Sequence, residues 1–188
     1  MELVPFADLY LVAAPGAVMT PRPATEGIVT AAVTHIGGRQ ARVADVGTGS
    51  GAIALAVASA CPTADVWATD TSVSAVEVAR LNARRLGLAE RVRVEHCDLL
   101  GPAPGRFDVV AANLPYLPAS LASERPELAG EPHDALFAPG DGLEPYRRLV
   151  DAAEPVLAED GVLLLQLHRE LITARREELP ALRLALAA

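Results

Sequence analysis

The chain has 188 residues, of which 51% are hydrophobic and 21% are charged, values typical of one globular domain with a sizeable core. Its formal net charge of -8 argues against nucleic acid as the main partner, because proteins that clamp a phosphate backbone usually carry a basic patch. The apolar stretch at residues 9–19 follows two acidic residues and is interrupted by Pro15 and Gly16. It fits neither a signal peptide nor a membrane span, so we expect a cytoplasmic protein without membrane contact.

Short apolar runs alternate with longer helical stretches, which predicts an α/β fold with a mainly parallel sheet and helices on both faces. We expect a single domain over residues 1–188, with residues 1–20 as an irregular lead-in and residues 168–188 as an atypical tail. The predicted strands are 42–46, 65–69, 92–96, 107–112 and 161–167. The predicted helices are 25–35, 52–59, 74–86 and 144–157. In the tail we expect a helix from Arg169 that breaks at Pro180, then a short strand or second helical piece at 182–187.

Three smaller features qualify this pattern. Ser74 and Glu77 have the spacing of a capping box, and Gly87 fits the end of the same helix. Residues 117–141 form a long polar loop rich in proline, and loops of this length in a compact domain are usually functional. The cysteines are far apart and the histidines show no ligand spacing, so we expect reduced thiols and no metal site.

A glycine-rich run, Asp-Val-Gly-Thr-Gly-Ser-Gly at residues 45–51, stands between a predicted strand and a predicted helix. Open parallel sheets bind nucleotides at this place, and glycines let the backbone turn sharply close to a ligand. The spacing differs from the Gly-x-Gly-x-x-Gly of dinucleotide sites. The acid that opens the run would repel a pyrophosphate but would suit the ammonium group of S-adenosylmethionine. We therefore predict that this cofactor is bound by Asp45, Gly47, Thr48, Gly49, Ser50 and Gly51.

Two further acids end the next two predicted strands. Asp70 ends the second strand, on the same sheet edge as Gly47, where a carboxylate can accept both ribose hydroxyls of a nucleoside. Asp98 ends the third strand, where it and the Leu99 amide could read the adenine edge. Each acid alone could equally cap a helix or lie in a loop. Together with the glycine run they predict a nucleoside site.

The fourth predicted strand ends in the turn Asn113-Leu114-Pro115-Tyr116. A planar amide or aromatic amine nitrogen is a poor nucleophile because its lone pair is delocalised. The Asn113 side-chain oxygen and the Leu114 carbonyl could each accept one N–H and aim that lone pair at the methyl carbon. Tyr116 could stack on the planar group, while Pro115 fixes the turn. The four residues are the predicted catalytic set, and Asn113 is also a predicted cofactor contact. Catalysis would consist mainly of positioning.

These segments resemble the HemK-type protein-(glutamine-N5) methyltransferases, which modify peptide-chain release factors. The similarity spans about residues 18–167 and includes 20–26 (Thr-Pro-Arg-Pro-Ala-Thr-Glu), 131–137 (Glu-Pro-His-Asp-Ala-Leu-Phe), 140–143 and 146–149. It implies a Rossmann-like class I fold and transfer of a methyl group from S-adenosylmethionine to a glutamine side-chain amide. It also implies cofactor contacts by residues 47–51, Asp70, Leu99 and Asn113, and glutamine contacts by residues 113–116.

The sequence departs from the family in three places. Leu114 stands where the family turn, Asn-Pro-Pro-Tyr, has its first proline. The resemblance covers the catalytic domain only, without the helical N-terminal domain that helps such enzymes grip the release factor. The chain also stops about where the family adds a final strand pair, so we expect that pair to be lacking and the exposed edge to favour a homo-oligomer. Three alternatives stay open: an amino-group methyltransferase acting on a nucleobase, one acting on a small molecule, and a catalytically degenerate cofactor-binding module.

Overall fold

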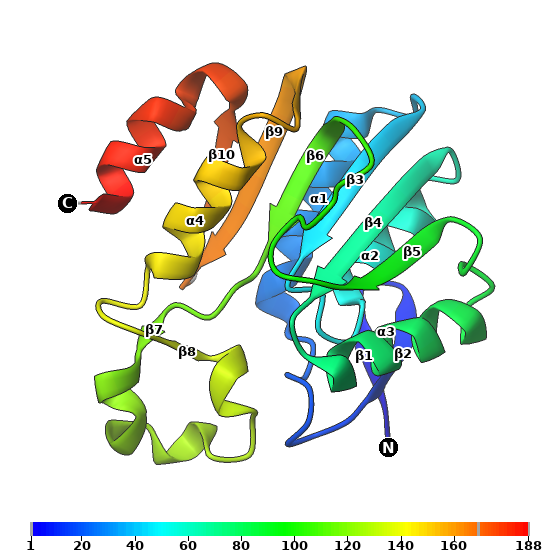
Figure 1. The fold of residues 1–188 in the computed structure, drawn as a ribbon. Helices are drawn as coiled ribbons and strands as arrows, with labels where there is room; N and C mark the ends of the chain where they lie inside the picture. Colours follow the sequence, from blue (N-terminus) through cyan, green and yellow to red (C-terminus); the bar gives the residue numbers. More distant parts are fainter. Residues whose placement is uncertain (1, 169, 188) are drawn as a thin grey trace.

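A six-stranded sheet forms the centre of the computed structural model, which describes residues 2–168 and 170–187 (Figure 1). The strand order is β5-β4-β3-β6-β9-β10, and every neighbouring pair is parallel except β10 with β9. The strands are β3 (Ala41–Val46), β4 (Ala64–Asp70), β5 (Val92–His96), β6 (Phe107–Ala112), β9 (Leu157–Leu167) and β10 (Glu170–Arg175). The predicted mainly parallel α/β architecture is confirmed, although β9 begins four residues earlier than the sequence suggested.

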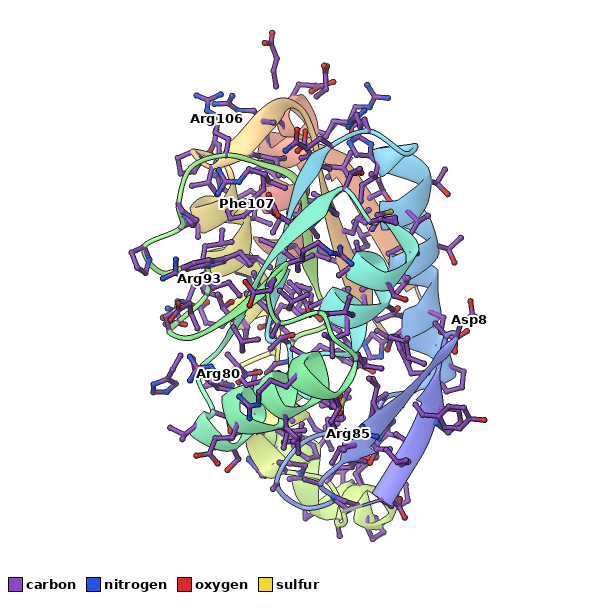
Figure 2. The ribbon with its side chains drawn as sticks, turned by 90° about the vertical axis from the view of Figure 1, so that its right-hand side faces the viewer. Asp8, Arg80, Arg85, Arg93, Arg106 and Phe107 are labelled. Atoms are coloured by element: carbon purple, nitrogen blue, oxygen red, sulfur yellow. The ribbon has the colours of Figure 1, made fainter. Side chains whose placement is uncertain are left out.

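Helices cover both faces of the sheet, as the alternation of strands and helices predicted. One face packs against α1 (Glu26–Ile36), α2 (Ala52–Ala60) and α3 (Val73–Arg85), and the other against α4 (Glu144–Ala153) and α5 (Leu179–Ala187). Successive residues of β3 show the division, because Val43 joins the first hydrophobic cluster and Ala44 the second. Arg80 of α3 also donates two hydrogen bonds to the Val94 carbonyl of β5, at 3.1 and 2.7 Å, which ties that helix to the outer strand (Figure 2).

An antiparallel hairpin opens the chain, so the prediction of an irregular lead-in is wrong. Its strands are β1 (Glu2–Phe6) and β2 (Leu9–Ala13). Phe6 and Leu11 are buried and belong to the same hydrophobic cluster as residues of α1, α2 and α3. The fully buried Asn82 of α3 accepts a hydrogen bond from Val12 N at 2.8 Å, and it donates to the carbonyls of Val12 and Ser50 at 3.1 and 2.9 Å. This amide therefore joins the glycine run to a hairpin that lies 70 residues before Asn82 in the sequence.

The tail is also more regular than predicted. The helix expected from Arg169 is wrong over the described residues, although Arg169 itself lies outside them, because β10 pairs antiparallel with β9 there. The expected lack of a final strand pair is thus corrected in part, since one antiparallel strand covers the edge of β9. The helical alternative for 182–187 is confirmed within α5, but Pro180 does not break it, because proline is tolerated in the first turn of a helix. Self-association through this edge stays a prediction.

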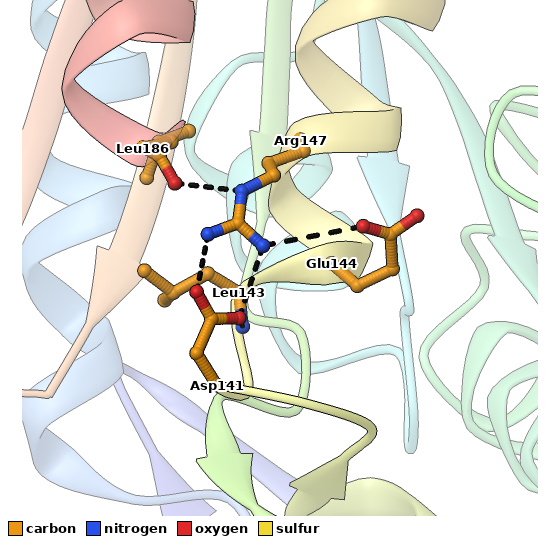
Figure 3. A network of polar contacts seen from close by, with 5 residues as sticks. All are labelled: Asp141, Leu143, Glu144, Arg147 and Leu186. Carbon is orange, nitrogen blue, oxygen red and sulfur yellow. Dashed lines mark hydrogen bonds and ion pairs between the residues drawn. The ribbon is translucent and has the colours of Figure 1, made fainter. Parts of the chain in front are cut away.

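A network around Arg147 holds α5 against α4 (Figure 3). The guanidinium donates to the Leu186 carbonyl of α5 at 2.6 Å and to both carboxylate oxygens of Asp141, and it lies 4.0 Å from Glu144. Asp141 in turn accepts from Leu143 N at 3.0 Å. The start of α4 is therefore fixed on two sides, by the preceding loop and by the last helix.

Three local predictions have clear outcomes. The cap of α3 is Ser72 rather than Ser74, because its hydroxyl accepts from Ala75 N at 3.3 Å; the end at Gly87 is confirmed by a φ of 70°. Helix α4 ends at Ala153, before Pro155, and so is shorter than predicted.

The loop at 117–141 contains three 3-10 turns and two two-residue strands: β7 (Leu117–Pro118), η2 (Ala119–Glu124), η3 (Pro126–Leu128), η4 (His133–Ala135) and β8 (Phe137–Ala138). Short 3-10 turns also precede α1 and α5, as η1 (Pro23–Thr25) and η5 (Arg176–Glu178).

Two features are absent from residues 2–168 and 170–187. No helix in this part of the chain is long and apolar enough to cross a membrane. No group of three or more histidine, cysteine, aspartate or glutamate side chains in the same residues could hold a metal ion.

Candidate active site

The glycine run forms the turn from β3 into α2, at the carboxyl edge of the sheet where the loop at 117–141 and the first hairpin also lie (Figure 1). Gly47, Gly49 and Gly51 have φ of 70°, 57° and 84°, a backbone region that side chains with a Cβ rarely adopt. The amides of Gly47 and Thr48 both donate to the Thr69 carbonyl of β4 at 2.9 Å. The turn is therefore pinned to the strand that carries Asp70.

Asp45 lies beneath this turn and does not line the cavity above it. The carboxylate is fully buried, and its Oδ2 accepts from the Thr48 hydroxyl at 2.6 Å and from Ala54 N at 3.0 Å. Its Oδ1 has no hydrogen-bond partner among the described residues. Burial raises the pKa of Asp45 to about 6, while the bonds from Thr48 and Ala54 oppose that shift. Asp45 thus stabilises the turn through Oδ2, while Oδ1 has no hydrogen-bond donor among the described residues.

Asp70 stands at the carboxyl end of β4, as predicted, and lines the cavity. Its Oδ2 accepts from Gly49 N and its Oδ1 from Ser72 N, both at 2.9 Å. One carboxylate therefore orients the glycine turn and the start of α3 together. Because a carboxylate oxygen has two lone pairs, each oxygen keeps one acceptor position for a ligand.

Asp98 and Leu99 follow β5 and also line the cavity. Leu99 has a φ of 47°, unusual for a residue with a Cβ, and its carbonyl accepts from the Thr69 hydroxyl at 2.6 Å. Asp98 accepts a hydrogen bond from Arg148 of α4, which lies at the same wall of the cavity. Sequence reasoning placed Arg148 in a segment similar to the family but gave it no role.

The turn at 113–116 follows β6 directly. The Asn113 side chain donates through Nδ2 to the Thr25 hydroxyl at 3.2 Å, which leaves its carbonyl oxygen as the group available to a ligand. The Leu114 amide donates to the Tyr146 hydroxyl at 3.1 Å. The Tyr116 ring lies 4.7 Å from the His168 ring, centroid to centroid, at an interplanar angle of 53°.

Two cavities meet at this turn. The larger, of about 680 Å³, extends from the glycine run past Asp70 and Asp98; the smaller, of about 340 Å³, lies beside Tyr116 and His168. Of the predicted site residues, Asp45 and Gly51 line neither cavity, Pro115 lines only the larger and Tyr116 only the smaller. The residues that line both are Met19, Thr25, Asn113, Leu114 and Ala135.

A family model described as "Methyltransferase small domain" matches residues 24–124, more than half of the chain. The chain belongs to this methyltransferase family. The matched residues contain the glycine run, Asp70, Asp98 and the turn at 113–116. The family match therefore includes Thr25, Asn113 and Leu114, three of the five residues that line both cavities.

Curated relatives point to a narrower group within the methyltransferases. The chain is 44% identical over 163 residues to the release factor glutamine methyltransferase of Gloeobacter violaceus, and 43% identical over 154 residues to that of Moorella thermoacetica. The matches cover 85% and 80% of this chain but 57% and 54% of those proteins, so the chain spans about half the length of the relatives. The predicted resemblance to the HemK-type family is confirmed.

A solved structure supports the fold assignment. A 16S rRNA methyltransferase of T. Thermophilus, in complex with AdoMet and guanosine, superposes with a TM-score of 0.62 at 18% sequence identity. The match covers 87% of this chain and 40% of that one. This methyltransferase therefore has the predicted Rossmann-like class I fold.

Two of the segments that carry the resemblance to the HemK-type family, residues 20–26 and 131–137, contact each other. Glu131 accepts from Thr20 N at 3.1 Å and pairs with Arg22 at 3.5 Å. Pro21 and Thr25 from one segment and Pro132, His133, Asp134 and Ala135 from the other line the larger cavity. Both segments carry the resemblance to the family, but nothing in the sequence marks them as cavity walls. The sequence carried no signal of this contact, because 109 residues separate Arg22 from Glu131.

Proposed function

We propose that this methyltransferase binds S-adenosylmethionine in the larger cavity and methylates a glutamine side-chain amide of a protein, with a peptide-chain release factor as the acceptor. One observation carries the proposal: Asn113 and Leu114 line both cavities, so two N–H acceptors stand where a cofactor site meets an acceptor site. The names of the curated relatives support the choice of glutamine. A cytoplasmic location belongs to the same proposal, because proteins of translation are found there.

The residues of the larger cavity fit the cofactor. S-adenosylmethionine supplies an activated methyl group on a sulfonium centre. Asp70 keeps a free acceptor position on each oxygen, which suits the two hydroxyls of a ribose. Asp98 and Leu99 line the same cavity, and a carboxylate with a backbone amide suits the edge of an adenine. The Oδ1 of Asp45, which has no hydrogen-bond partner among the described residues, is a buried acceptor below the glycine turn that suits a bridging water, while Asp45 itself lines neither cavity.

The turn at 113–116 suits a nitrogen that carries two hydrogens. Because the Asn113 amide nitrogen is engaged by Thr25, its oxygen is held ready to accept one N–H. The Leu114 carbonyl accepts the other, and together the two acceptors aim the nitrogen lone pair toward the larger cavity. No strong base is required before transfer, since the proton leaves once the nitrogen has become cationic.

The smaller cavity suits a planar amide presented by a polypeptide. Tyr116 and His168 form a tilted aromatic pair on its wall, against which a planar amide can stack. Arg22, Arg125 and Glu127 add charged groups of both signs around it. These groups offer hydrogen bonds to a peptide backbone rather than a uniformly basic surface for a phosphate backbone.

The test is a methyl-transfer assay with a labelled cofactor. The purified chain is incubated with methyl-labelled S-adenosylmethionine and a release-factor protein, and the labelled residue is located by mass spectrometry. We expect N5-methylglutamine from the parent chain, and formation of it about 100- to 1,000-fold slower from Asn113→Ala. The same assay is repeated with cell extract in place of the release factor. If a nucleobase or small molecule is labelled there and protein is not, the acceptor is that molecule and not glutamine. Cofactor binding without any transfer would contradict the enzymatic proposal.

A further inference from the structure

The side chain of Tyr146 joins three parts of the protein that the sequence keeps apart. It belongs to the first turn of α4 and is fully buried. Its hydroxyl accepts from Leu114 N at 3.1 Å and lies 2.9 Å from the Leu114 carbonyl oxygen and 2.5 Å from that of Gln166 in β9. The helix turn that carries Tyr146 is anchored by the Arg147 network (Figure 3).

This contact exists because residue 114 is not proline. The family turn has proline at this position, and proline has no backbone N–H. Leucine brings an N–H, and with Leu114 only 7% exposed that group is buried with the rest of the residue. A buried N–H needs an acceptor, and the Tyr146 oxygen is the one that it finds. The departure from the family pattern thus adds one hydrogen bond, from the Leu114 amide to a tyrosine in the segment 146–149 that is similar to the family.

The phenol has a single proton and two carbonyls within reach. Burial raises the pKa of Tyr146 above its ordinary value, so the hydroxyl stays protonated at physiological pH. At any moment it donates either to Gln166 or to Leu114, and the Gln166 oxygen is the nearer. Donation to Gln166 leaves the Leu114 carbonyl free for an acceptor N–H, while the Leu114 amide remains held by the same hydroxyl oxygen.

We infer that Tyr146 is a positioning residue for methyl transfer: its hydroxyl holds the Leu114 peptide group so that the carbonyl faces the acceptor nitrogen. The inference rests on the proposed function, since it gives the Leu114 carbonyl its role. Tyr146 need not touch substrate or cofactor, and it lines neither cavity. Because Tyr146 is also part of a hydrophobic cluster, the test must separate its hydroxyl from its ring.

The first variant is Tyr146→Phe, which removes the hydroxyl and keeps the ring. We expect kcat with the glutamine acceptor to fall by about 10- to 100-fold, because the carbonyl is no longer held in place. The KM for the acceptor and the cofactor affinity measured by calorimetry should stay within about twofold, since neither site loses a contact. The matched control is Tyr10→Phe, which removes a hydroxyl from a tyrosine that is 65% exposed on β2 and should leave kcat unchanged.

The second variant, Leu114→Pro, removes the N–H that Tyr146 accepts. In this background Tyr146→Phe should lower kcat by only about threefold or less, because no buried donor is left without a partner. An equal loss in both backgrounds would assign the effect to the ring or to the carbonyls and overturn the inference. So would an unchanged kcat in Tyr146→Phe while the parent chain is active. A parent chain that binds the cofactor but methylates no glutamine would overturn the proposed function and this inference together.

Discussion

Replacing Gly47 with alanine would place a methyl group against the catalytic turn. A Cβ at this position would lie 2.6 Å from the Leu114 Cδ2 atom, whereas carbon atoms in contact are ordinarily about 3.5–4.0 Å apart. Leu114 is 7% exposed and packed in a hydrophobic cluster, so its side chain has little room to move. The substitution therefore forces the leucine, and the peptide group beside it, away from their places.

The size of the effect follows from overpacking. Inserting a methyl group into a well-packed site costs about 1–3 kcal/mol. For a protein of this length, each 1 kcal/mol lowers Tm by roughly 2–4 °C, so the contact with Leu114 alone should cost about 2–12 °C. A displacement of about 1 Å at the turn should also lower kcat by about 100-fold. Thermal unfolding followed by circular dichroism and a methyl-transfer assay measure the two quantities.

Gly87→Ala is the matched control. Gly87 has the same φ of 70°, but nothing lies within 4 Å of a Cβ placed there. Both variants share the left-handed backbone strain and the loss of freedom in the unfolded chain, so their difference isolates the contact with Leu114. Equal Tm values for the two variants, or a Gly47→Ala protein as active as Gly87→Ala, would refute the reasoning.

Three further predictions concern the acids and the catalytic amide. Asn113→Ala should lower turnover by about 100- to 1,000-fold with little change in cofactor affinity; equal losses of both would contradict its role as an N–H acceptor. Asp70→Ala should weaken cofactor binding in calorimetry, and an unchanged affinity would rule out the ribose assignment. Burial raises the pKa of Asp45 from 3.8 to about 6. Between about pH 4 and 6, Asp45 is therefore protonated in the folded protein and ionised in the unfolded chain. As the pH rises through this window, the free energy of unfolding of the parent chain, measured with urea, should fall by up to about 3 kcal/mol relative to that of Asp45→Asn. Parallel curves of unfolding free energy against pH for the two proteins would contradict this prediction.

Much of the candidate site could be predicted from the sequence because its signals are local. A glycine run between a strand and a helix, and acids at the ends of strands, are readable within a few residues. Parallel strands bring their carboxyl ends to one edge of the sheet, so Gly47, Asp70, Asp98 and Asn113 had to come together once the strands were recognised. The structure places all four on the wall of one cavity.

Other features depend on contacts between residues that are far apart in the sequence, and such contacts leave no local sequence pattern. The strands of the first hairpin pair with each other, but the hairpin is held against the domain by Asn82, 70 residues away, so its place in the fold was not visible in the sequence. Asp45 looked like a ligand contact, but only the packing of Thr48 and Ala54 around it shows that it is buried below the turn.

The sequence by itself determined the sheet, its glycine turn and the chemistry of its strand ends, since backbone conformation and alternation act over neighbouring residues. Only the tertiary structure decided which groups hold those residues in place. Tyr146 reaches Leu114 across 32 residues and Gln166 across 20, and β10 closes an edge that the sequence left open. Long-range packing selects such partners because buried donors must find acceptors wherever the fold brings them.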